Sequence, residues 1–316
     1  MKELTIISGK GGSGKTSLVA AFAALAENHI LVDADVDAAD LHLVLSPEVK
    51  TETEFKGGYK AEIDPDLCTA CEICTDRCGF DAIDQEFQVD QTKCEGCGVC
   101  KYFCPFDAVS FKQQTCGRWF VSETRCGPMV HARLGIMEEN SGMLVSLLRK
   151  EARDIAEANQ YQTIIVDGPP GIGCPVISSM TGVDAVLIIT EPSLSGLHDM
   201  KRVFELSKFL TAPAMVCVNK HDINPEITQT IISYAKENNI KYVGSIPYDP
   251  DVIAAMVAQQ TLIEYTSGKA ATAVKKIWAN VSDYLEKLHE PIFFPKSDHD
   301  FSENLLETTN PDPISR

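Results

Sequence analysis

Long apolar runs and basic side chains are both scarce in this 316-residue sequence. No hydrophobic stretch approaches the ~20 residues that a membrane-spanning helix needs, so we expect no stable membrane insertion. Lys and Arg total 28 against 45 Asp and Glu, which gives a net charge of −17. Because a phosphate backbone would meet a repulsive field at such a surface, we expect no nucleic-acid partner.

We also expect no secretory leader, since the first apolar segment, residues 4–8, begins almost at once. We therefore expect a cytoplasmic protein. In that compartment, twelve cysteines grouped at metal-ligand spacing indicate metal binding rather than disulfides. The length allows one large domain or two smaller ones, with ample material for a buried core.

A glycine-rich segment, residues 9–16, lies between that apolar segment and an alanine-rich helical stretch. It has the phosphate-binding pattern G-x-x-x-x-G-K-[ST] in the required strand–loop–helix context. Glycines let successive N–H groups point at phosphate oxygens, and the helix N-terminus adds its positive end. Lys15 is expected to reach the β- and γ-phosphates of ATP, and the Thr16 hydroxyl to bind Mg²⁺. The predicted nucleotide-binding residues here are Gly9, Gly11, Gly12, Ser13, Gly14, Lys15, Thr16 and Ser17.

The same loop contains a second lysine, Lys10, which an ordinary phosphate loop does not need. The run from Lys10 to Thr16 resembles the deviant Walker A motif of the MinD/ParA/Mrp ATPases and the nitrogenase iron protein. This resemblance implies that Lys10 crosses a dimer interface to the partner's nucleotide. The active form would then be an ATP-sandwich dimer, with a second copy or with a paralogous ATPase. A solvated loop lysine is the alternative.

Carboxylates follow two further apolar segments. The first segment, residues 30–32, leads into Asp33 and Asp35, which corresponds to switch I in the resembled family. The resemblance implies that Asp35 positions the attacking water, with Asp33 as the fallback, while Asp37 and Asp40 are either solvated or cap a helix. The second segment ends at Asp167, which we expect to hold the water shell of Mg²⁺. The form Asp-Gly-Pro-Pro-Gly at 167–171 resembles switch II of Mrp-type carriers.

Eight cysteines form two C-x₂-C-x₂-C-x₃-C runs that repeat at 26 residues, and Phe-Asp-Ala-Ile at 80–83 recurs as Phe-Asp-Ala-Val at 106–109. This is the bacterial ferredoxin signature, in which the fourth cysteine of each run ligates the other cluster. Zinc is the alternative, although structural zinc usually uses separated C-x₂-C pairs. Gly79 stands after the first run where the usual run has proline. The resemblance implies one 4Fe–4S cluster on Cys68, Cys71, Cys74 and Cys104, and another on Cys94, Cys97, Cys100 and Cys78.

The remaining chain alternates between apolar strands and helical periodicity, which predicts a βαβ series and a parallel sheet with helices on both faces. Residues 47–61 look like a polar linker, and residues 115–137 look irregular or form short strands. A helix is expected over 139–159, capped by Asn140 or Ser141. The other expected elements are strands at 185–190 and 214–218 and helices at 194–210, 224–238 and 267–288.

The predicted fold class is therefore an α/β parallel-sheet P-loop NTPase, like MinD, ParA and the nitrogenase iron protein, with an inserted α+β ferredoxin domain. The expected ATPase domain comprises residues 1–56 and 114–290, and the ferredoxin domain residues 57–113. An acidic tail, 291–316, is expected to be mobile. It lacks the basic amphipathic helix by which MinD binds membranes.

Several residues beyond these motifs also resemble family positions. Asn219, at a strand end, resembles the asparagine that reads adenine, and Pro247 lies in a segment resembling the loop beside adenine. Cys174 lies seven residues after Asp167, the offset of a cluster-ligating cysteine in the nitrogenase iron protein. It is a candidate ligand of a further cluster at the dimer interface, with Cys116 or Cys126 as candidate companions. The alternatives are a small buried residue at a helix start for Cys174 and unpaired thiols for Cys116 and Cys126; Cys217 is expected to be packing.

Three functions fit these features. The first is an ATP-driven electron-transfer protein, in which hydrolysis opens and closes the dimer and gates delivery from two clusters to a redox acceptor protein. The second is a Mrp-type iron–sulfur carrier, favoured by the Pro-Pro-Gly of switch II and by Cys174, although no C-x-x-C exists beyond Cys104. The third is a redox-sensing regulatory or positioning ATPase. We favour the first.

Overall fold

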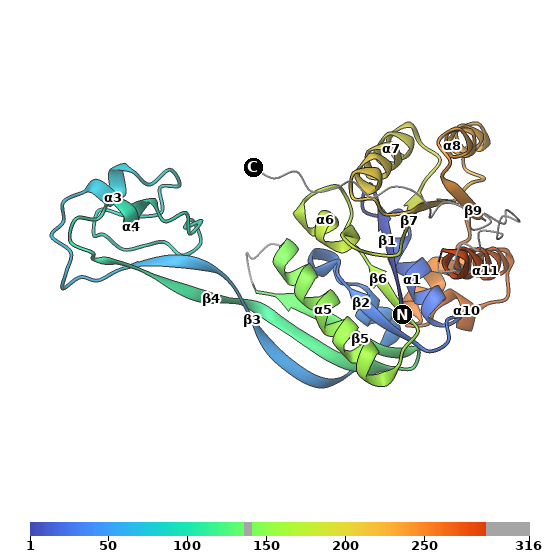
Figure 1. Cartoon of the computed structure of the whole chain (residues 1–316), viewed down its shortest axis with the longest axis horizontal. Coiled ribbons are helices and arrows are strands. Elements are labelled where there is room, and N and C mark those ends of the chain that lie inside the picture. The colour runs from blue at the N-terminus through green and yellow to red at the C-terminus, as the bar shows by residue number, and fades with distance from the viewer. Residues whose placement is uncertain (136–140, 289–316) are drawn as a thin grey trace, which may run out of the picture.

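Within residues 1–135 and 141–288, the part of the chain that this computed structural model describes, nine strands form one sheet (Figure 1). Their spatial order is β3-β4-β5-β2-β6-β1-β7-β8-β9. Seven neighbouring strands run parallel, as the βαβ pattern predicted. They are β5 (Gly127–Leu134), β2 (His29–Asp33), β6 (Thr163–Asp167), β1 (Lys2–Ser8), β7 (Ala185–Thr190), β8 (Ala214–Asn219) and β9 (Lys241–Ile246).

Helices cover both faces of this sheet, so its central strands are apolar on both sides. In β1, for example, Leu4 and Ile6 belong to the core on one face and Ile7 to the core on the other. The first face is covered by α1 (Lys15–Ala23), α2 (Leu41–Leu45), α9 (Asp251–Val257), α10 (Leu262–Tyr265) and α11 (Lys269–Lys287). The second face is covered by α5 (Gly142–Asn159), α6 (Cys174–Met180), α7 (Leu194–Phe209) and α8 (Pro225–Glu237).

Two long strands extend the sheet into a ribbon. β3 (Glu48–Ile63) and β4 (Val109–Thr124) pair antiparallel along their lengths, and β4 also pairs antiparallel with β5 from Gly117 to Thr124. The predicted parallel sheet therefore has two antiparallel strands, β3 and β4, added at one edge. Beyond Gly117 the two strands continue as a two-stranded ribbon away from the helices (Figure 1).

Residues 47–61 are not a linker, since β3 occupies most of them. For residues 115–137, expected to be irregular or to form short strands, the described part contains the end of β4 and all of β5, so the strand alternative is confirmed. The composition was misleading because β3 lies at the sheet edge and is largely exposed, so it lacks the apolar alternation of a half-buried strand. At its outer end, this strand pair is connected by a segment that we call the distal lobe.

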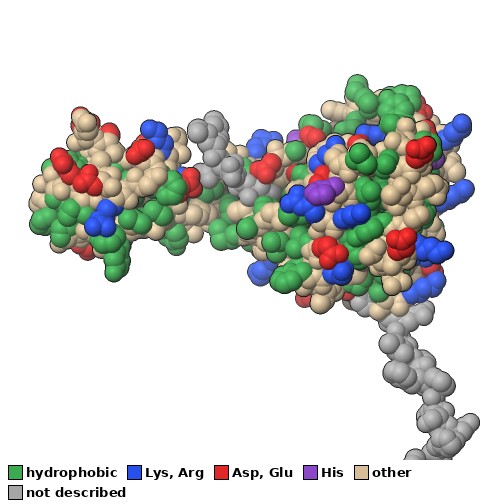
Figure 2. Space-filling view, turned by 90° about the horizontal axis from the view of Figure 1, so that it is seen from above, with side chains coloured by type: hydrophobic (Ala, Val, Ile, Leu, Met, Phe, Trp, Pro, Cys, Tyr) green, Lys and Arg blue, Asp and Glu red, His purple; other side chains and the backbone are tan. Residues whose placement is uncertain are grey.

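The distal lobe, residues 64–108, connects the outer ends of β3 and β4. It contains two short helices, α3 (Ile73–Asp76) and α4 (Val99–Phe103), and a bridge between Ile83 and Val89. Figure 1 shows it at the far end of the ribbon from the helix-covered part of the sheet. In Figure 2 it projects to the left, with hydrophobic side chains, cysteines included, gathered on its surface.

The predicted helices are confirmed with small shifts in their ends. The Ser141 side chain caps α5 by accepting from Leu144 N at 3.2 Å, while Glu139 and Asn140 lie outside the described residues, as does the tail 291–316. The sequence did not predict β9 or the short helices α2, α9 and α10, nor the 3₁₀ turn η1 (Val36–Ala38). Among the described residues, none of the helices combines the length and apolarity required to cross a bilayer.

Candidate functional site

The glycine-rich segment curls between β1 and α1 at the carboxyl end of the sheet. Gly14 caps α1 with a left-handed φ of +86°, and a Cβ there would lie 2.3 Å from Asn219 Nδ2. A Cβ at Gly9 would lie 2.2 Å from Asp199 Cβ. Only glycine fits at both positions, so this loop is held in one shape by close contacts as well as by its own conformational freedom.

Lys15 lies at the centre of the site. Its ammonium donates to Asp35 Oδ2 at 2.9 Å and to Asp167 Oδ1 at 2.6 Å, and the side chain is only 5 % exposed. Asp33 ends β2 and Asp167 ends β6, and the two are direct partners in the parallel register. Thus the two aspartates that the sequence placed at separate strand ends, Asp35 and Asp167, meet on one lysine.

The electrostatics of this group follow from burial. Burial alone lowers the pKa of Lys15, but the negative charges of Asp167 and Asp35 outweigh it, so its pKa is raised. Burial, with repulsion from Asp167, raises the pKa of Asp33 well above its usual range. Burial likewise raises the pKa of Asp35, against the opposing effect of Lys15. Two carboxylates therefore contact the one lysine, and the third, Asp33, lies close enough for its pKa to respond to all three charges.

Several buried polar atoms at this site have no hydrogen bond of ordinary geometry among the described residues. They are Ser13 Oγ, Asp167 Oδ2 and both carboxylate oxygens of Asp33. Buried polar atoms are normally paired, so these oxygens have unused capacity for a ligand. Oxygen donors beside a phosphate-binding loop suit Mg²⁺, which prefers carboxylates, hydroxyls, water and phosphate oxygens. The residues present therefore fit a magnesium nucleotide.

Residues at the ends of β7 and β8 lie beside the loop. Asn219 donates from Nδ2 to Ser13 O at 2.8 Å, so it is tied to the loop backbone. The next residue, Lys220, contacts Glu191 and reaches Gly12 O at 3.4 Å. The sequence analysis did not single out this Lys220–Glu191 pair, although both residues directly follow strands.

The other predicted residues lie around this centre. Lys10 is exposed on the loop, and Thr16 and Ser17 are half-buried in the first turn of α1. Pro247 follows β9, where Tyr248 N donates to Asp222 Oδ1 at 2.7 Å and so ties this segment to the one after Asn219. Gly11, Gly12 and Ser13 lie on the same loop. The fold therefore gathers all predicted nucleotide residues at one edge of the sheet.

The eight repeated cysteines divide between two cavities in the distal lobe. Both are small, with a cavity volume of about 20 Å³ each. The first is lined by Cys78, Cys94, Cys97 and Cys100, and the second by Cys68, Cys71, Cys74 and Cys104. This is the crossed pairing that the ferredoxin pattern implied, with the fourth cysteine of each run in the cavity of the other.

Backbone groups support both crossed cysteines in the same way. Ala82 N donates to Cys78 Sγ at 3.4 Å, and Ala108 N donates to Cys104 Sγ at 3.3 Å. Within the described residues, no group of three or more His, Cys, Asp or Glu side chains converges as a single metal ion would need. Four cysteines line each cavity, which is the number of thiolate ligands that a 4Fe–4S cluster takes, so this set of ligands fits such a cluster.

The other cysteines differ in their surroundings. Cys174 begins α6 and is exposed, so the alternative of a buried packing residue is wrong. Cys217 is fully buried in β8, and burial raises its pKa to about 12, as expected for packing. The buried Cys116 thiol donates to Gly57 O at 2.7 Å. Cys126 is half-buried in the turn between β4 and β5.

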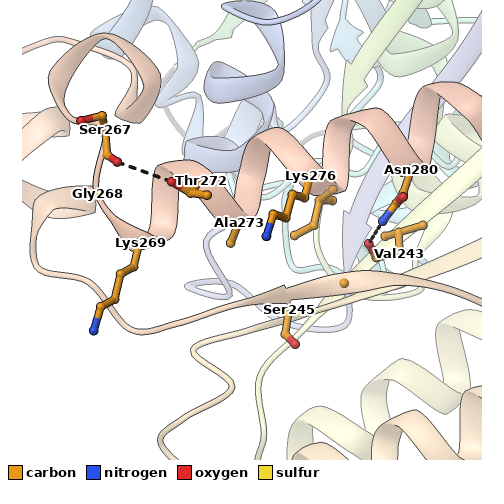
Figure 3. Close-up of a pocket in the computed structure, with 11 residues that line it drawn as sticks. Val243, Ser245, Ser267, Gly268, Lys269, Thr272, Ala273, Lys276 and Asn280 are labelled. Atoms are coloured by element: carbon orange, nitrogen blue, oxygen red, sulfur yellow. Dashed lines mark hydrogen bonds between the residues drawn. The ribbon is translucent and has the colours of Figure 1, made fainter.

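An open groove lies elsewhere, between β9 and α11 (Figure 3). Asn280 spans it by donating to Val243 O at 2.8 Å, and Lys269, Lys276 and Ser245 also line it. None of the residues that the sequence predicted as functional lines this groove. It is therefore separate from the phosphate-binding loop.

Comparison with known proteins settles the family. Residues 4–262 match the family described as "CobQ/CobB/MinD/ParA nucleotide binding domain". The chain belongs to this family. It is thus a MinD/ParA-type P-loop nucleotide-binding protein, and this part of the predicted resemblance is confirmed.

Similar proteins support the same fold. The uncharacterized protein MJ0578 of Methanocaldococcus jannaschii is 33% identical over 287 residues, 90% of this chain and 97% of its own. The cell division ATPase MinD of Pyrococcus furiosus has a TM-score of 0.57 at 18% identity, covering 90% of this chain and 99% of that one. MinD of Pyrococcus horikoshii, solved with Mg-ADP, has a TM-score of 0.57 at 17% identity, covering 92% and 99%. At these identities the two structures show the fold alone.

Proposed function

We propose that this family member is an ATPase whose nucleotide-driven dimer switch controls electron transfer through two 4Fe–4S clusters. The observation that carries the proposal is the division of eight cysteines between two cavities in the crossed arrangement of a two-cluster ferredoxin. The ferredoxin domain would comprise residues 57–113, inserted between the two switch segments of the ATPase.

The nucleotide side of the proposal rests on Lys15 and its two aspartates. When ATP binds, the β- and γ-phosphates replace Asp35 and Asp167 as partners of the Lys15 ammonium. Asp167 is then free to hold the water shell of Mg²⁺, together with the Thr16 hydroxyl, and Asp35 is free to orient the attacking water. Asn219 and Pro247 would border the adenine. The Mg-ADP bound to the Pyrococcus horikoshii MinD supports the choice of nucleotide and metal.

Lys10 is proposed to act on the nucleotide of a partner subunit. Its side chain is exposed on the loop, so it is available for contact with a second chain. Hydrolysis would then require the dimer, formed with a second copy or with a paralogous ATPase. Cys174, exposed at the start of α6, remains a candidate ligand of a further cluster at that interface.

On the redox side, each bound cluster would supply a one-electron couple, and the chain provides thiolate ligands and an apolar enclosure. Ala82 N and Ala108 N donate to the two crossed sulfurs, which favours thiolates at those positions. Phe111 and Val109, from β4, close the two cavities from the ribbon side. The acceptor would be a redox or iron–sulfur protein.

Contacts between helices could transmit a movement at the nucleotide site to the ribbon that carries the distal lobe. The segment after Asp167 leads into α6, which packs so closely on α5 that a Cβ at Gly142 would lie 2.5 Å from Ser178 Oγ. The adjacent Met143 reaches the ribbon, where a Cβ at Gly57 would lie 3.3 Å from its Cε. A shift of switch II can therefore reach β3 through α6 and α5.

Spectroelectrochemistry of anaerobically prepared protein, with ADP and with a non-hydrolysable ATP analogue, tests this coupling. We expect the cluster potentials or the rate of electron transfer to an acceptor to differ between the two states. The Lys15→Ala variant, which should not bind nucleotide, serves as the matched control and should show no difference. Equal potentials and equal rates in both nucleotide states would remove the gating function.

Cluster delivery is the second candidate, favoured by the exposure of Cys71 and Cys97, one in each site. It predicts that iron and sulfide leave the reconstituted protein for an apo-acceptor, faster with ATP. Electron transfer predicts that both stay bound through repeated reduction cycles, so iron analysis of the protein after turnover separates the two functions.

A further inference from the structure

The two cysteine cavities lie at different distances from the ATPase sheet. Ala61 and Phe111, which pair across the ribbon, line the Cys94 cavity, while the next rung outward on the same face, Ile63 with Val109, lines the Cys68 cavity. Two residues along a strand correspond to about 7 Å. Gly96, which also lines the Cys94 cavity, lies against the backbone of β3 still further inward, because a Cβ added there would lie 2.0 Å from Tyr59 O. The Cys94 site is therefore the inner one and the Cys68 site the outer one.

A positive charge held in place by a hydrogen bond adjoins the inner site. The half-buried Lys60 side chain donates from Nζ to Cys94 O at 2.8 Å. This bond holds the ammonium against the backbone of a residue whose thiol lines the inner cavity. On the same rung of the ribbon, Lys112 lies opposite Lys60, but its ammonium pairs with Glu62 instead.

The outer site has an acidic residue at the equivalent position of the repeat. A shift of 26 residues, which superposes Cys68 on Cys94, places Lys60 on Glu86. Glu86 is exposed and lines the open groove beside Cys68, together with Phe87. Of these two equivalent residues, the one beside the inner cysteines is basic and half-buried, and the one beside the outer cysteines is acidic and exposed.

From this asymmetry, and resting on the proposed function, we infer that Lys60 makes the inner cluster the higher-potential one, so that electrons pass from the outer site toward the ATPase. A cation stabilises the more negative, reduced state of a nearby group, and the effect is strongest where water is excluded. In the exchange, the outer group loses one electron and the inner group gains it, with no bond or proton changing place.

Other charges near the inner site do not alter this order. Glu95 lines the inner cavity, and Lys93 and Lys101 flank two of its cysteines, but all three side chains are exposed. Water and salt screen exposed charges, so their effect on the cavity is small. Lys60 differs because it is half-buried and held by a hydrogen bond.

The test is a redox titration of the full chain, prepared without oxygen, poised with dithionite and followed by electron paramagnetic resonance. Wild-type protein should show two separate one-electron steps. In Lys60→Met the higher potential should fall, with about a tenfold change in the equilibrium between the two sites, or ~59 mV, while the lower potential stays in place. Lys60→Arg should restore the separation. The matched control Lys112→Met, on the same rung, should leave both potentials unchanged.

The converse change acts at the outer site. Because Glu86 is exposed, Glu86→Lys should raise the lower potential by much less than Lys60→Met lowers the higher one. Identical potentials in the wild type, equal shifts of both steps in Lys60→Met, or the same response in Lys112→Met would each overturn the inference while leaving the clusters established. A chain without clusters would instead show no iron–sulfur signal in any variant, which would be a failure of the proposed function itself.

Discussion

The ammonium of Lys15 lies 2.6 Å from Asp167 Oδ1, and this contact joins the first turn of the phosphate-loop helix to the end of a neighbouring strand. Both side chains are nearly inaccessible to water. A buried ion pair of this kind is sensitive to the loss of either partner, because the remaining charge has no solvent to stabilise it. The same ion pair therefore also stabilises the packing of α1 against the end of β6.

The first prediction follows from the buried ion pair between Lys15 and Asp167. Lys15→Met should abolish nucleotide binding and lower the free energy of unfolding by about 3–5 kcal/mol, since it leaves buried carboxylates without a counter-charge. Denaturant unfolding with and without nucleotide measures both effects. Lys220→Met is the matched control: its partner is Glu191 in a more exposed pair, so its cost should be about 1 kcal/mol. Equal costs for the two variants would contradict the central place of Lys15.

The second prediction concerns the exposed lysine of the same loop. Lys10→Ala should bind nucleotide normally but hydrolyse it about 10²–10³-fold more slowly, because a charge that acts across the dimer would be missing from the transition state. Hydrolysis should also rise with protein concentration in the wild type, in step with dimer formation measured by light scattering. A Lys10 variant that hydrolyses at the wild-type rate would refute a role in trans.

The third prediction compares two glycines of one loop. Gly14→Ala should displace Asn219 and impose a strained φ, costing about 1–3 kcal/mol and weakening nucleotide binding. Gly11→Ala should have little effect on folding, because no atom lies within 4 Å of the added Cβ. Thermal unfolding and nucleotide titration of both variants would check this. The prediction fails if the two substitutions prove equally harmful or equally harmless.

How far the sequence alone could predict this protein depends on where each residue's partners lie. The phosphate loop, Asp35, Asp167 and the cysteine runs were found because their spacing is local and chemically specific. The ribbon strand β3 was missed because it is largely exposed, so no apolar alternation marks it. Lys220 was missed because its partners, Glu191 and Gly12, are far away in the sequence. Contacts between strand ends appear only once the sheet order is known.

The fourth prediction is that the free energy of unfolding depends on pH through the ion pair between Arg125 and Glu264. Hydrogen bonds from Arg125 lower the pKa of Glu264 to about 2, and the pair joins the turn between β4 and β5 to α10. Because this folded-state pKa lies below the ordinary value of about 4.3, the stabilisation is present above pH ~4.3 and is lost as the pH falls toward 2. Glu264 is 32 % exposed, so we expect only about 1 kcal/mol after solvent screening.

Denaturant unfolding of Glu264→Gln checks this sign. The variant should be about 1 kcal/mol less stable than wild type at pH 7, and the difference should shrink between pH 4.5 and 3. Glutamine can keep the backbone bond of the capping box at Thr261, so the comparison isolates the ion pair. Glu205→Gln, in an exposed helical pair with Lys208, is the control and should cost at most ~0.5 kcal/mol. A difference that grows toward low pH would show that the pair does not act as described.

The fifth prediction separates the two cysteine sets. Cys74→Ser should reduce the iron content by half and leave ATP binding intact, because its cavity is distinct from the one around Cys94. Cys126→Ser should leave the iron content unchanged, since that thiol lies in the turn between β4 and β5, outside the distal lobe. Loss of all iron from Cys74→Ser, with the protein still folded, would show that the two sites are not independent.

The most direct measurement is the iron, acid-labile sulfide and zinc content of wild-type protein purified without oxygen, combined with Mössbauer spectroscopy. Two cubane clusters per chain predict about eight iron and eight sulfide per polypeptide, with the spectrum of 4Fe–4S centres. Zinc in place of iron, or thiols that take up no metal under reconstitution, would contradict the proposal that this ATPase has a two-cluster electron relay at the end of its ribbon.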